Sequence, residues 1–402
     1  MHVIQENRAS TNSQVPYVHP PDISSTPNIL VYVACCDDAS IVRRIWGIVL
    51  AALLLGGVGV ALVQGRDDGG TATTTLRGVI GSEKAEFFAD PEVVDMLAER
   101  GYEVRTDSVG SWAMEDVDLG GYDFAFPSSQ GPAQELAARA GSPSAPLRPF
   151  YSPLVVLARG AAAEVLAAEG LATLEDEHRG LLSMSGYLDA VGAGRAWGEL
   201  TGADPQNGLA GTLYVSSTDP LTSNSGALYL AAASYVANDG TVVADQDGVE
   251  RVAPLLRTLI QVQGTQQPSS DGPFRDFVSG IGNPLVLAYE SQIASLLLAD
   301  QDPGDVVVLY PDTTVSSDHT LVPLTEAGRG LGQLLTEDPE LRRLAVRHGF
   351  RPQGATAEFT EAAGAHAAHL NAGLTGVRQA PPPTSDVLRQ LAERATGRSE
   401  GS

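Results

Sequence analysis

Short apolar runs with strand character alternate with helical patterns along most of the chain. The run at 154–158 is almost wholly apolar, as expected of a strand buried on both faces. A helix over 89–101 has Asp90 as its N-cap, Pro91 in its first turn and Gly101 as its stop signal. The other expected strands are 75–80, 102–107, 122–127, 211–217, 284–289, 306–309 and 321–322. The other expected helices are 161–172, 181–200, 227–237, 248–264 and 328–348.

This alternation predicts an α/β fold with parallel sheets. About 300 residues are too many for one such sheet, so we expect two lobes. One lobe is predicted over 75–152 plus 310–378 and the other over 153–309. Residues 379–402 are expected to form a polar C-terminal tail with one marginal helix after the proline run.

The N-terminal part has a different pattern. Residues 45–63 contain no charged side chain, and at about 1.5 Å per residue they nearly span a hydrocarbon core of ~30 Å. Arg43 and Arg44 precede this run, and Asp67 and Asp68 follow it. The sequence therefore predicts a transmembrane helix over 43–65, with the N-terminus in the cytoplasm and the main body outside the cell membrane.

This predicted helix could either remain as a membrane anchor or be cleaved as a signal peptide. A signal peptide has a shorter apolar run, of about 7–15 residues, so the length favours an uncleaved, single-pass anchor. Cleavage after Gly59-Val60-Ala61 is the other possibility. Residues 1–42 are predicted to be a disordered cytoplasmic tail, unless translation starts near Val42. Residues 66–74 are rich in Gly and Thr and are interpreted as a linker.

Charge and cysteine content exclude several classes of function. The 402 residues include 49 acidic and 25 basic side chains, for a net charge of −24. Such a surface does not attract nucleic acid or an anionic bilayer. The two cysteines are adjacent, at Cys35 and Cys36, so no disulfide framework, Cys nucleophile or Cys-ligated metal is expected in the main body. Lys84 is the only lysine of the chain.

Hydroxyl-bearing and glycine residues follow the predicted strands repeatedly. Ligands of open α/β sheets bind at the carboxyl ends of strands, where helix N-termini present free N–H groups. Any one of these loops could be an ordinary helix cap, but loops on both halves of the chain favour a shared cleft. The candidate ligand-binding residues are Ser82, Glu83, Lys84, Ser111, Trp112, Ser128, Ser129, Thr218, Ser223, Asn224, Ser225, Tyr289 and Glu290.

The order of these motifs resembles the type II extracytoplasmic (periplasmic) solute-binding proteins, the superfamily that includes molybdate- and sulfate-binding proteins. Gly81-Ser82 is similar to the first ligand loop of that superfamily, and Val109-Gly110-Ser111 to its second. The run from Ser217 to Tyr229 is similar to the loop of the second lobe, and Tyr289 to a tyrosine that lines the cleft. The resemblance covers about 75–352. It implies two lobes joined by crossings near 152–154 and 309–319, which close on a ligand by a hinge.

The function implied is a membrane-anchored, bacterial, extracytoplasmic protein that captures a small polar solute, with a membrane permease as partner and no cofactor. The same fold used as an envelope sensor or assembly module without transport is one alternative. An unrecognised hydrolase or transferase is another. Trp112 and Glu290 do not suit a simple oxyanion site, which favours a solute with hydroxyl or amine groups.

Enzyme motifs are absent from the sequence. It has no G-x-S-x-G elbow, no H-E-x-x-H and no G-x-x-x-x-G-K-[ST] loop, so we do not expect an enzyme. His366 and His369 have a spacing that metal pairs can use, but their Ala-rich surroundings favour a solvated helix face. We therefore predict no metal site.

Overall fold

The computed structural model describes residues 73–398, which belong to one compact unit. The expected transmembrane helix, cytoplasmic tail and most of the linker lie outside these residues. Within 73–398, no helix is long and apolar enough to cross a membrane.

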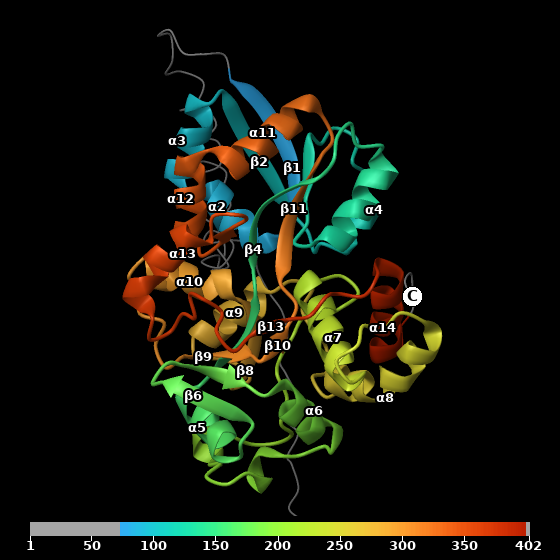
Figure 1. Ribbon diagram of the computed structural model, residues 1–402, viewed down its shortest axis with the longest axis vertical. Coiled ribbons are helices and arrows are strands. Elements are labelled where there is room, and N and C mark those ends of the chain that lie inside the picture. Colours follow the sequence, from blue (N-terminus) through green and yellow to red (C-terminus); the bar gives the residue numbers. More distant parts are fainter. Residues whose placement is uncertain (1–72, 399–402) are drawn as a thin grey trace, which may run out of the picture. The chain divides into compact units, whose positions relative to one another are not determined.

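Two mixed sheets organise this unit (Figure 1). The first sheet has the strand order β12-β4-β11-β3-β1-β2. Its strands are β1 (Thr74–Ile80), β2 (Tyr102–Ser108), β3 (Phe124–Phe126), β4 (Leu147–Ser152), β11 (Ser317–Pro323) and β12 (Arg351–Pro352). The second sheet has the order β6-β7-β9-β5-β8. Its strands are β5 (Leu154–Ala158), β6 (Ala172–Asp176), β7 (Arg179–Leu182), β8 (Leu285–Tyr289) and β9 (Val307–Pro311).

The expectation of parallel sheets was wrong. In the first sheet only the β1–β2 and β1–β3 pairs are parallel, and in the second only β7–β9. The remaining pairs are antiparallel, among them β4 and β11, which run in opposite directions beside each other. The chain leaves the first sheet at Pro153, between β4 and β5, and returns over 312–316, between β9 and β11.

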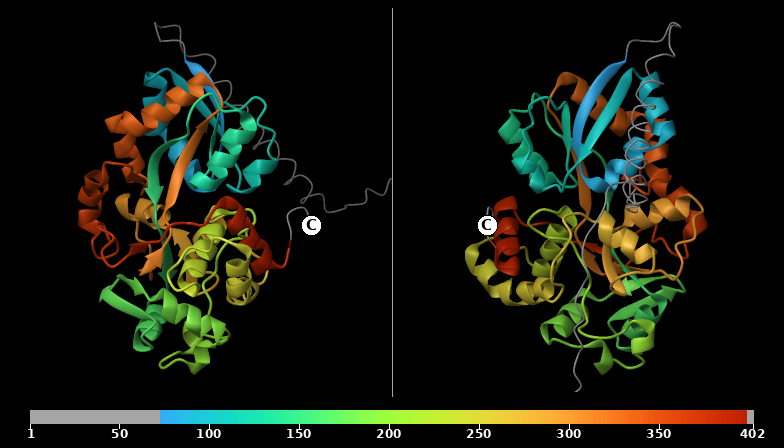
Figure 2. Two further views of the ribbon diagram at one scale, coloured as in Figure 1. Left: turned by 45° about the vertical axis from the view of Figure 1, so that its right-hand side comes forward. Right: turned by 180° about the vertical axis from the view of Figure 1, so that it is seen from behind.

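Helices cover both sheets (Figures 1 and 2). Those nearest the first sheet are α2 (Ala85–Ala89), α3 (Pro91–Glu99), α4 (Gln130–Ala140), α11 (Glu326–Glu337) and α12 (Pro339–Arg347). Those of the second lobe are α5 (Gly160–Ala168), α6 (Met184–Gly192), α7 (Asn224–Ala237), α8 (Gln246–Gln261), α9 (Asp271–Val278) and α10 (Glu290–Leu298). Helix α13 (Thr356–Ala363) contacts both α12 and α10.

Local capping explains where the helices begin and end. Asp90 accepts a hydrogen bond from the Glu92 backbone N–H at 2.8 Å, with Pro91 at the first position, as the sequence predicts. The predicted helix 328–348 is divided into α11 and α12, because Asp338 caps a new helix and Pro339 has no N–H to continue the old one. The predicted helix 181–200 begins only at Met184, after the Ser183 cap.

The predicted strand 211–217 was wrong. This segment makes only two isolated bridges. Thr212 pairs with Ala196, and the Ser216 backbone bonds to Leu285 and Leu287 of β8. Strands β4, β6 and β7 were missed, because their apolar runs are short and interrupted by charged residues.

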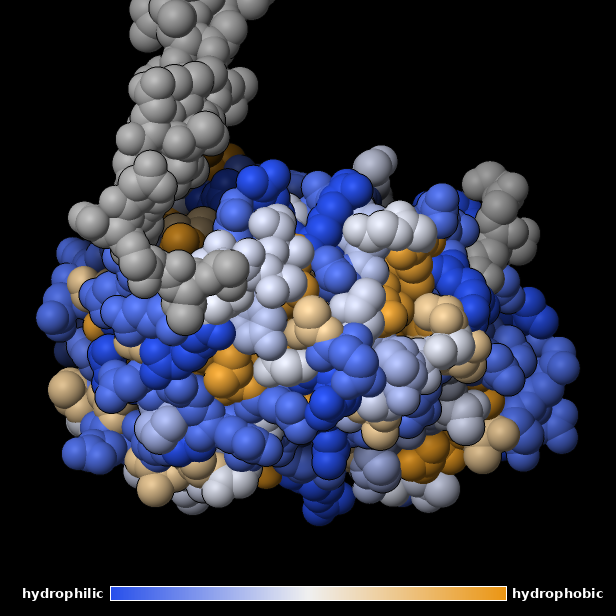
Figure 3. All heavy atoms as spheres, turned by 90° about the horizontal axis from the view of Figure 1, so that it is seen from above, coloured by the Kyte–Doolittle hydropathy of each residue, from blue (hydrophilic) through white to orange (hydrophobic). Residues whose placement is uncertain are grey.

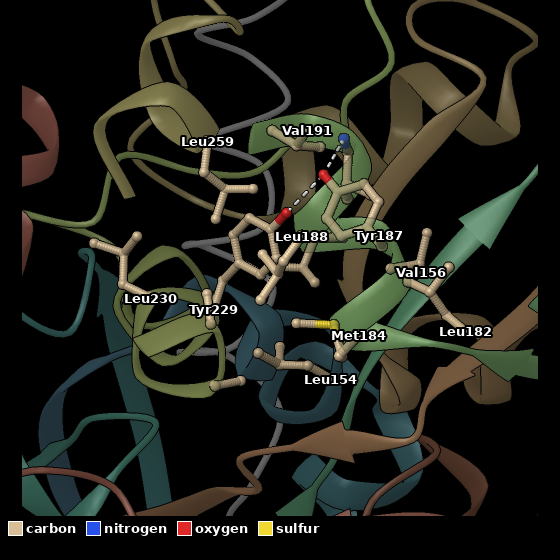
Figure 4. Close-up of a cluster of buried hydrophobic side chains, with 14 of the residues drawn as sticks. Leu154, Val156, Leu182, Met184, Tyr187, Leu188, Val191, Tyr229, Leu230 and Leu259 are labelled. Atoms are coloured by element: carbon tan, nitrogen blue, oxygen red, sulfur yellow. Dashed lines mark hydrogen bonds between the residues drawn. The ribbon is translucent and has the colours of Figure 1, made fainter. Parts of the chain in front are cut away.

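Each lobe has its own apolar core. Six phenylalanines fill the core of the first lobe, and the rings of Phe150 and Phe350 stack at 4.4 Å. In the second lobe, the hydroxyl groups of Tyr187 and Tyr229 lie 2.9 Å apart among aliphatic side chains (Figure 4). Burial raises the pKa of Tyr187 to about 12, so this hydroxyl stays protonated and supports the core by hydrogen bonding. The face in Figure 3 is mostly hydrophilic, in keeping with the acidic composition.

The C-terminal segment is part of the fold. Residues 379–402 were expected to be a polar tail, but β13 (Arg378–Gln379) pairs with β10 (Thr313–Thr314), and α14 (Ser385–Thr396) packs on α8 and α7 (Figures 1 and 2). Arg389 of this helix also contacts Glu115 and Glu135, at 2.8 Å each. The segment therefore connects both lobes. The buried face of α14 consists of Val387, Leu388, Leu391, Ala392 and Ala395.

Candidate functional site between the lobes

The two lobes contact each other through backbone groups at the start of a short 3-10 helix. The N–H groups of Trp112 and Ala113 donate to the Thr222 carbonyl of the second lobe, at 3.2 and 3.4 Å. Gly110 is required at this contact, because a Cβ atom built on it would lie 2.4 Å from the Thr222 oxygen. The predicted second loop therefore lies at the lobe interface.

Asn224, at the start of α7, lies at the centre of the interface. Its Oδ1 accepts from the Ser129 hydroxyl at 2.6 Å. Its Nδ2 donates to the Ser128 carbonyl at 3.3 Å and to the Tyr289 hydroxyl at 3.2 Å. These contacts bring together the loop after β3, the start of α7 and the end of β8.

Lys84 forms a second group of polar contacts beside Asn224. Its side chain is fully buried, and its ammonium group donates to the Glu83 carboxylate and, at 3.2 Å, to the Ser128 hydroxyl. The Ser111 hydroxyl lies 3.0 Å from the same Ser128 hydroxyl. His319 of β11 completes the group, with its Nδ1 3.2 Å from Lys84 Nζ.

Burial and charge pairing determine the protonation of this group. Burial alone would raise the pKa of Glu83, but the Lys84 charge and a hydrogen bond from His319 outweigh it and hold that pKa well below its usual range. Burial, reinforced by Lys84, lowers the pKa of His319 to about 4. Burial also lowers the pKa of Lys84, and the charge of Glu83 and its hydrogen bond oppose this effect. At neutral pH the Glu83 carboxylate therefore lies against the Lys84 amine, beside a neutral imidazole.

Two cavities flank these contacts. The larger, about 390 Å³, is lined by Trp112 and Ser129 of the first lobe, Leu228 of the second and part of the C-terminal segment. The residues of that segment that line it are Gln379, Ala380, Pro382, Pro383, Ser385 and Leu388. The indole N–H of Trp112 is buried and has no hydrogen-bond partner.

The smaller cavity, about 290 Å³, lies on the Glu83 side. Its walls come from both lobes: Ser82, Glu83 and Glu86 from the first, and α9 and α10 from the second. Of the candidate residues from the sequence, Trp112 and Ser129 line the larger cavity, and Ser82 and Glu83 line the smaller one.

Glu290 lies elsewhere than the sequence analysis expected. It is fully buried, and both of its carboxylate oxygens accept hydrogen bonds from Arg351, at 2.5 and 2.8 Å. The Tyr310 hydroxyl also donates to it at 2.6 Å. The Glu290 carboxylate is therefore paired within the protein, and Glu290 does not line either cavity.

A further group of predicted residues forms a separate cluster. Thr218 and Ser225 share a hydrogen bond of 2.8 Å, and Ser223 lies 3.2 Å from Ser225. Thr218 also accepts from the Gly226 N–H at 2.9 Å. Of these hydroxyls, only that of Thr218 accepts from a backbone N–H of α7, and none of the three lines either cavity.

Sequence reasoning missed several side chains of the interface. Asp271, Arg275 and Phe274 of α9 line the smaller cavity, although no predicted strand ends near them. The run of Ser269 and Ser270 before Asp271 is a helix-start signal that could have pointed to this element. Ser317 was also missed. Its hydroxyl donates to the Ser128 carbonyl because β11 pairs with β4, and no pattern in the sequence around Ser317 indicates this contact.

Metal binding finds no support among residues 73–398. No group of three or more His, Cys, Asp and Glu side chains there is placed to bind an ion. His369 instead stacks on His178, with ring centroids 4.4 Å apart, while His366 lies in the short turn before it.

Lys84 provides a direct measure of whether the interface is closed. Because it is the only lysine and is fully buried, we expect its ε-amine to acylate at least ~100 times more slowly in the folded chain than in urea. Mass spectrometry of the peptide that contains Lys84 separates this reaction from labelling of the N-terminal amine. Equal rates in the two states would contradict a closed interface.

Comparison with known proteins supports the fold. No family model matches the chain, and no curated protein matches it by sequence. Among solved structures, an ABC-transporter solute-binding protein of Thermotoga lettingae, bound to α-D-tagatose, is 14% identical with a TM-score of 0.50. That match covers 81% of this chain and 95% of the other.

Two further solved structures are similar at lower scores. The sulfate-binding protein SubI of Mycobacterium tuberculosis is 17% identical over 73% of this chain and 91% of its own, with a TM-score of 0.47. Iron-bound HitA of Pseudomonas aeruginosa is 11% identical over 80% and 97%, with a TM-score of 0.48. The match with a TM-score of 0.50 confirms the two-lobed fold that the sequence predicted.

Proposed function

We propose that this protein is a membrane-anchored, extracytoplasmic solute-binding protein that captures a small polar ligand between its lobes for a transport system. The observation that carries the proposal is the buried polar interface in which Ser128, Ser129 and Lys84 of the first lobe meet Asn224 and Tyr289 of the second. Buried polar groups of this number are costly to desolvate unless they are paired. A solute that enters between the lobes can take over some of these hydrogen bonds.

The connections between the sheets suit a hinge. Only Pro153 separates β4 from β5, and residues 312–316 connect β9 with β11. Backbone rotation at a few such residues can change the angle between two lobes without disturbing either core. Binding without turnover is proposed because the similar structures are those of binding proteins.

The anchor and the location are also proposals. The apolar run 45–63, with Arg43 and Arg44 on one side, supports a single-pass helix and an extracytoplasmic main body. We expect the full chain to stay with the membrane after carbonate washing. A soluble product that starts near Leu62 would show cleavage instead.

Gly110 allows a test of lobe closure. We expect Gly110→Ala to push Thr222 away and to disfavour the closed state, because overpacking costs about 1–3 kcal/mol. Solute affinity should then fall about 5- to 100-fold, and acylation of Lys84 should become faster. Calorimetry with any bound solute and the acylation assay measure the two effects.

Gly198→Ala is the matched control. A Cβ atom at Gly198 meets no atom within 4 Å, so affinity and acylation should not change. If Gly110→Ala left both quantities at their wild-type values, the interface would not be the closing surface, and the proposed function would lose its main support.

A further inference from the structure

The smaller cavity carries more acidic than basic groups. Glu83, Glu86 and Asp271 line it. The basic groups beside them are Lys84, which pairs with Glu83, Arg275, whose guanidinium lies 4.0 Å from Glu86, and His348, whose ring contacts Asp90. Among the described residues, Asp271 is thus the carboxylate of this cavity that has no ion-pair partner. A ligand with a single positive charge would supply one.

Asp271 is the carboxylate best placed to meet such a ligand. It is the first residue of α9, and its Oδ1 accepts from the Gln292 side chain at 3.2 Å. Burial, together with the nearby charges of Glu83 and Glu86, raises the pKa of Asp271. A cation between these carboxylates would remove the repulsion that this shift reflects.

A buried hydroxyl group in the same wall has no partner. Ser291 of α10 is 2% exposed and lines the cavity, and its Oγ makes no hydrogen bond with the protein. A buried hydroxyl without a partner is unusual and costs free energy, so a ligand group that bonds to it is favoured. This observation is independent of the carboxylates and points to a ligand with a hydrogen-bonding group, such as a hydroxyl, at this position.

Apolar side chains also line the cavity. Phe274 and Val278 of α9 and Leu296 of α10 are among them, so the cavity offers hydrocarbon contacts as well as hydrogen-bond acceptors. One aromatic ring does not form the aromatic cage that quaternary ammonium ions need. A primary amine, whose N–H groups donate to carboxylates, fits the acceptors better.

We propose that this cavity binds a small primary amine that carries a hydroxyl group and a short apolar part. The proposal rests on the proposed function and names the solute class. The amine lies among Asp271, Glu83 and Glu86, the hydroxyl reaches Ser291, and the apolar part contacts Phe274 and Leu296.

Three probes of similar size and different charge test the proposal. They are 5-amino-1-pentanol, the neutral 1,5-pentanediol and the anionic 5-hydroxypentanoate, each titrated calorimetrically into the full chain in detergent micelles. We expect the amine to bind at least about tenfold more tightly than the other two, because only the amine makes charge-assisted hydrogen bonds with the carboxylates. Sulfate and glucose extend the panel to a simple anion and a neutral sugar.

Variants assign the binding to this cavity. Asp271→Asn should weaken binding of the amine about tenfold or more, and Ser291→Ala should weaken it by a smaller factor. Glu340→Gln changes an exposed carboxylate that pairs with Arg343, and should leave the affinity unchanged. Circular dichroism and the melting temperature of each variant separate lost binding from lost folding.

The outcomes distinguish this proposal from the one on which it rests. Tighter binding of the diol, the anion, sulfate or glucose, weakened by Gly110→Ala but not by Asp271→Asn, would overturn the amine and leave solute binding in place. Amine binding that Asp271→Asn does not affect would also overturn the assignment to this cavity. Absence of binding by the whole panel would refute the amine and weigh against the proposed function as well.

Discussion

Replacing Glu290 with Gln is expected to lower the free energy of unfolding by about 3–5 kcal/mol. Glu290 and Arg351 form an ion pair in which both side chains are at most 2% exposed. Arg351 also donates to the backbone carbonyls of Asn371 and Ala372, at 2.9 and 2.7 Å, so it cannot move to water when its partner is lost. The neutral amide would leave a guanidinium charge buried without compensation. Urea denaturation of the full chain measures the change.

Two comparisons make this result specific. Glu340→Gln breaks an exposed pair with Arg343 and should change stability by less than about 0.5 kcal/mol. The double variant Glu290→Leu/Arg351→Met removes both charges and should recover much of the loss, because well-packed apolar groups often replace a buried pair. A loss below about 1 kcal/mol for Glu290→Gln would show that the pair is more hydrated than its burial indicates.

Leu391→Ala is expected to destabilise the chain by about 2–5 kcal/mol. Leu391 is fully buried where α14 packs on α8, in the same apolar cluster as Leu256 and Leu259. Removing its branched end leaves a cavity that two packed helices cannot close. Thermal and urea unfolding should both report the loss.

The neighbouring position provides the control. Gln390 is exposed on the same helix, and Gln390→Ala should stay within about 0.5 kcal/mol of the wild type. If Leu391→Ala behaved like Gln390→Ala, the C-terminal segment would be a detachable tail after all. The larger cavity, which this segment lines, would then be open to solvent.

The helix α14 illustrates how local pattern and tertiary contact differ. The sequence indicated one marginal helix after the proline run, and the apolar residues Val387, Leu388 and Leu391 are visible there. A stripe of this kind is stable only when another helix covers it. The helix that covers it is α8, more than a hundred residues earlier in the chain. This pairing could not be predicted from either segment alone.

Glu290 illustrates the same limit for the site. It follows a strand end beside Tyr289, so its position along the chain is that of a ligand-binding residue. Its partner Arg351 lies 61 residues away, and no sequence motif around Arg351 predicts that the two side chains pair. Because Glu290 pairs with Arg351, it does not line either cavity, whereas the adjacent Ser291 lines the smaller one.

The α/β class and the two lobes could be predicted from the sequence, because periodicity, caps and strand-end loops are local properties that each segment carries. The sequence also pointed to Lys84, Ser128, Asn224 and Tyr289, which the structure brings together. The antiparallel pairings, the partner of Glu290 and the role of α9 in the smaller cavity could not be predicted in this way. These depend on contacts between distant segments, whose energies arise only once both cores have excluded water and the lobes have met.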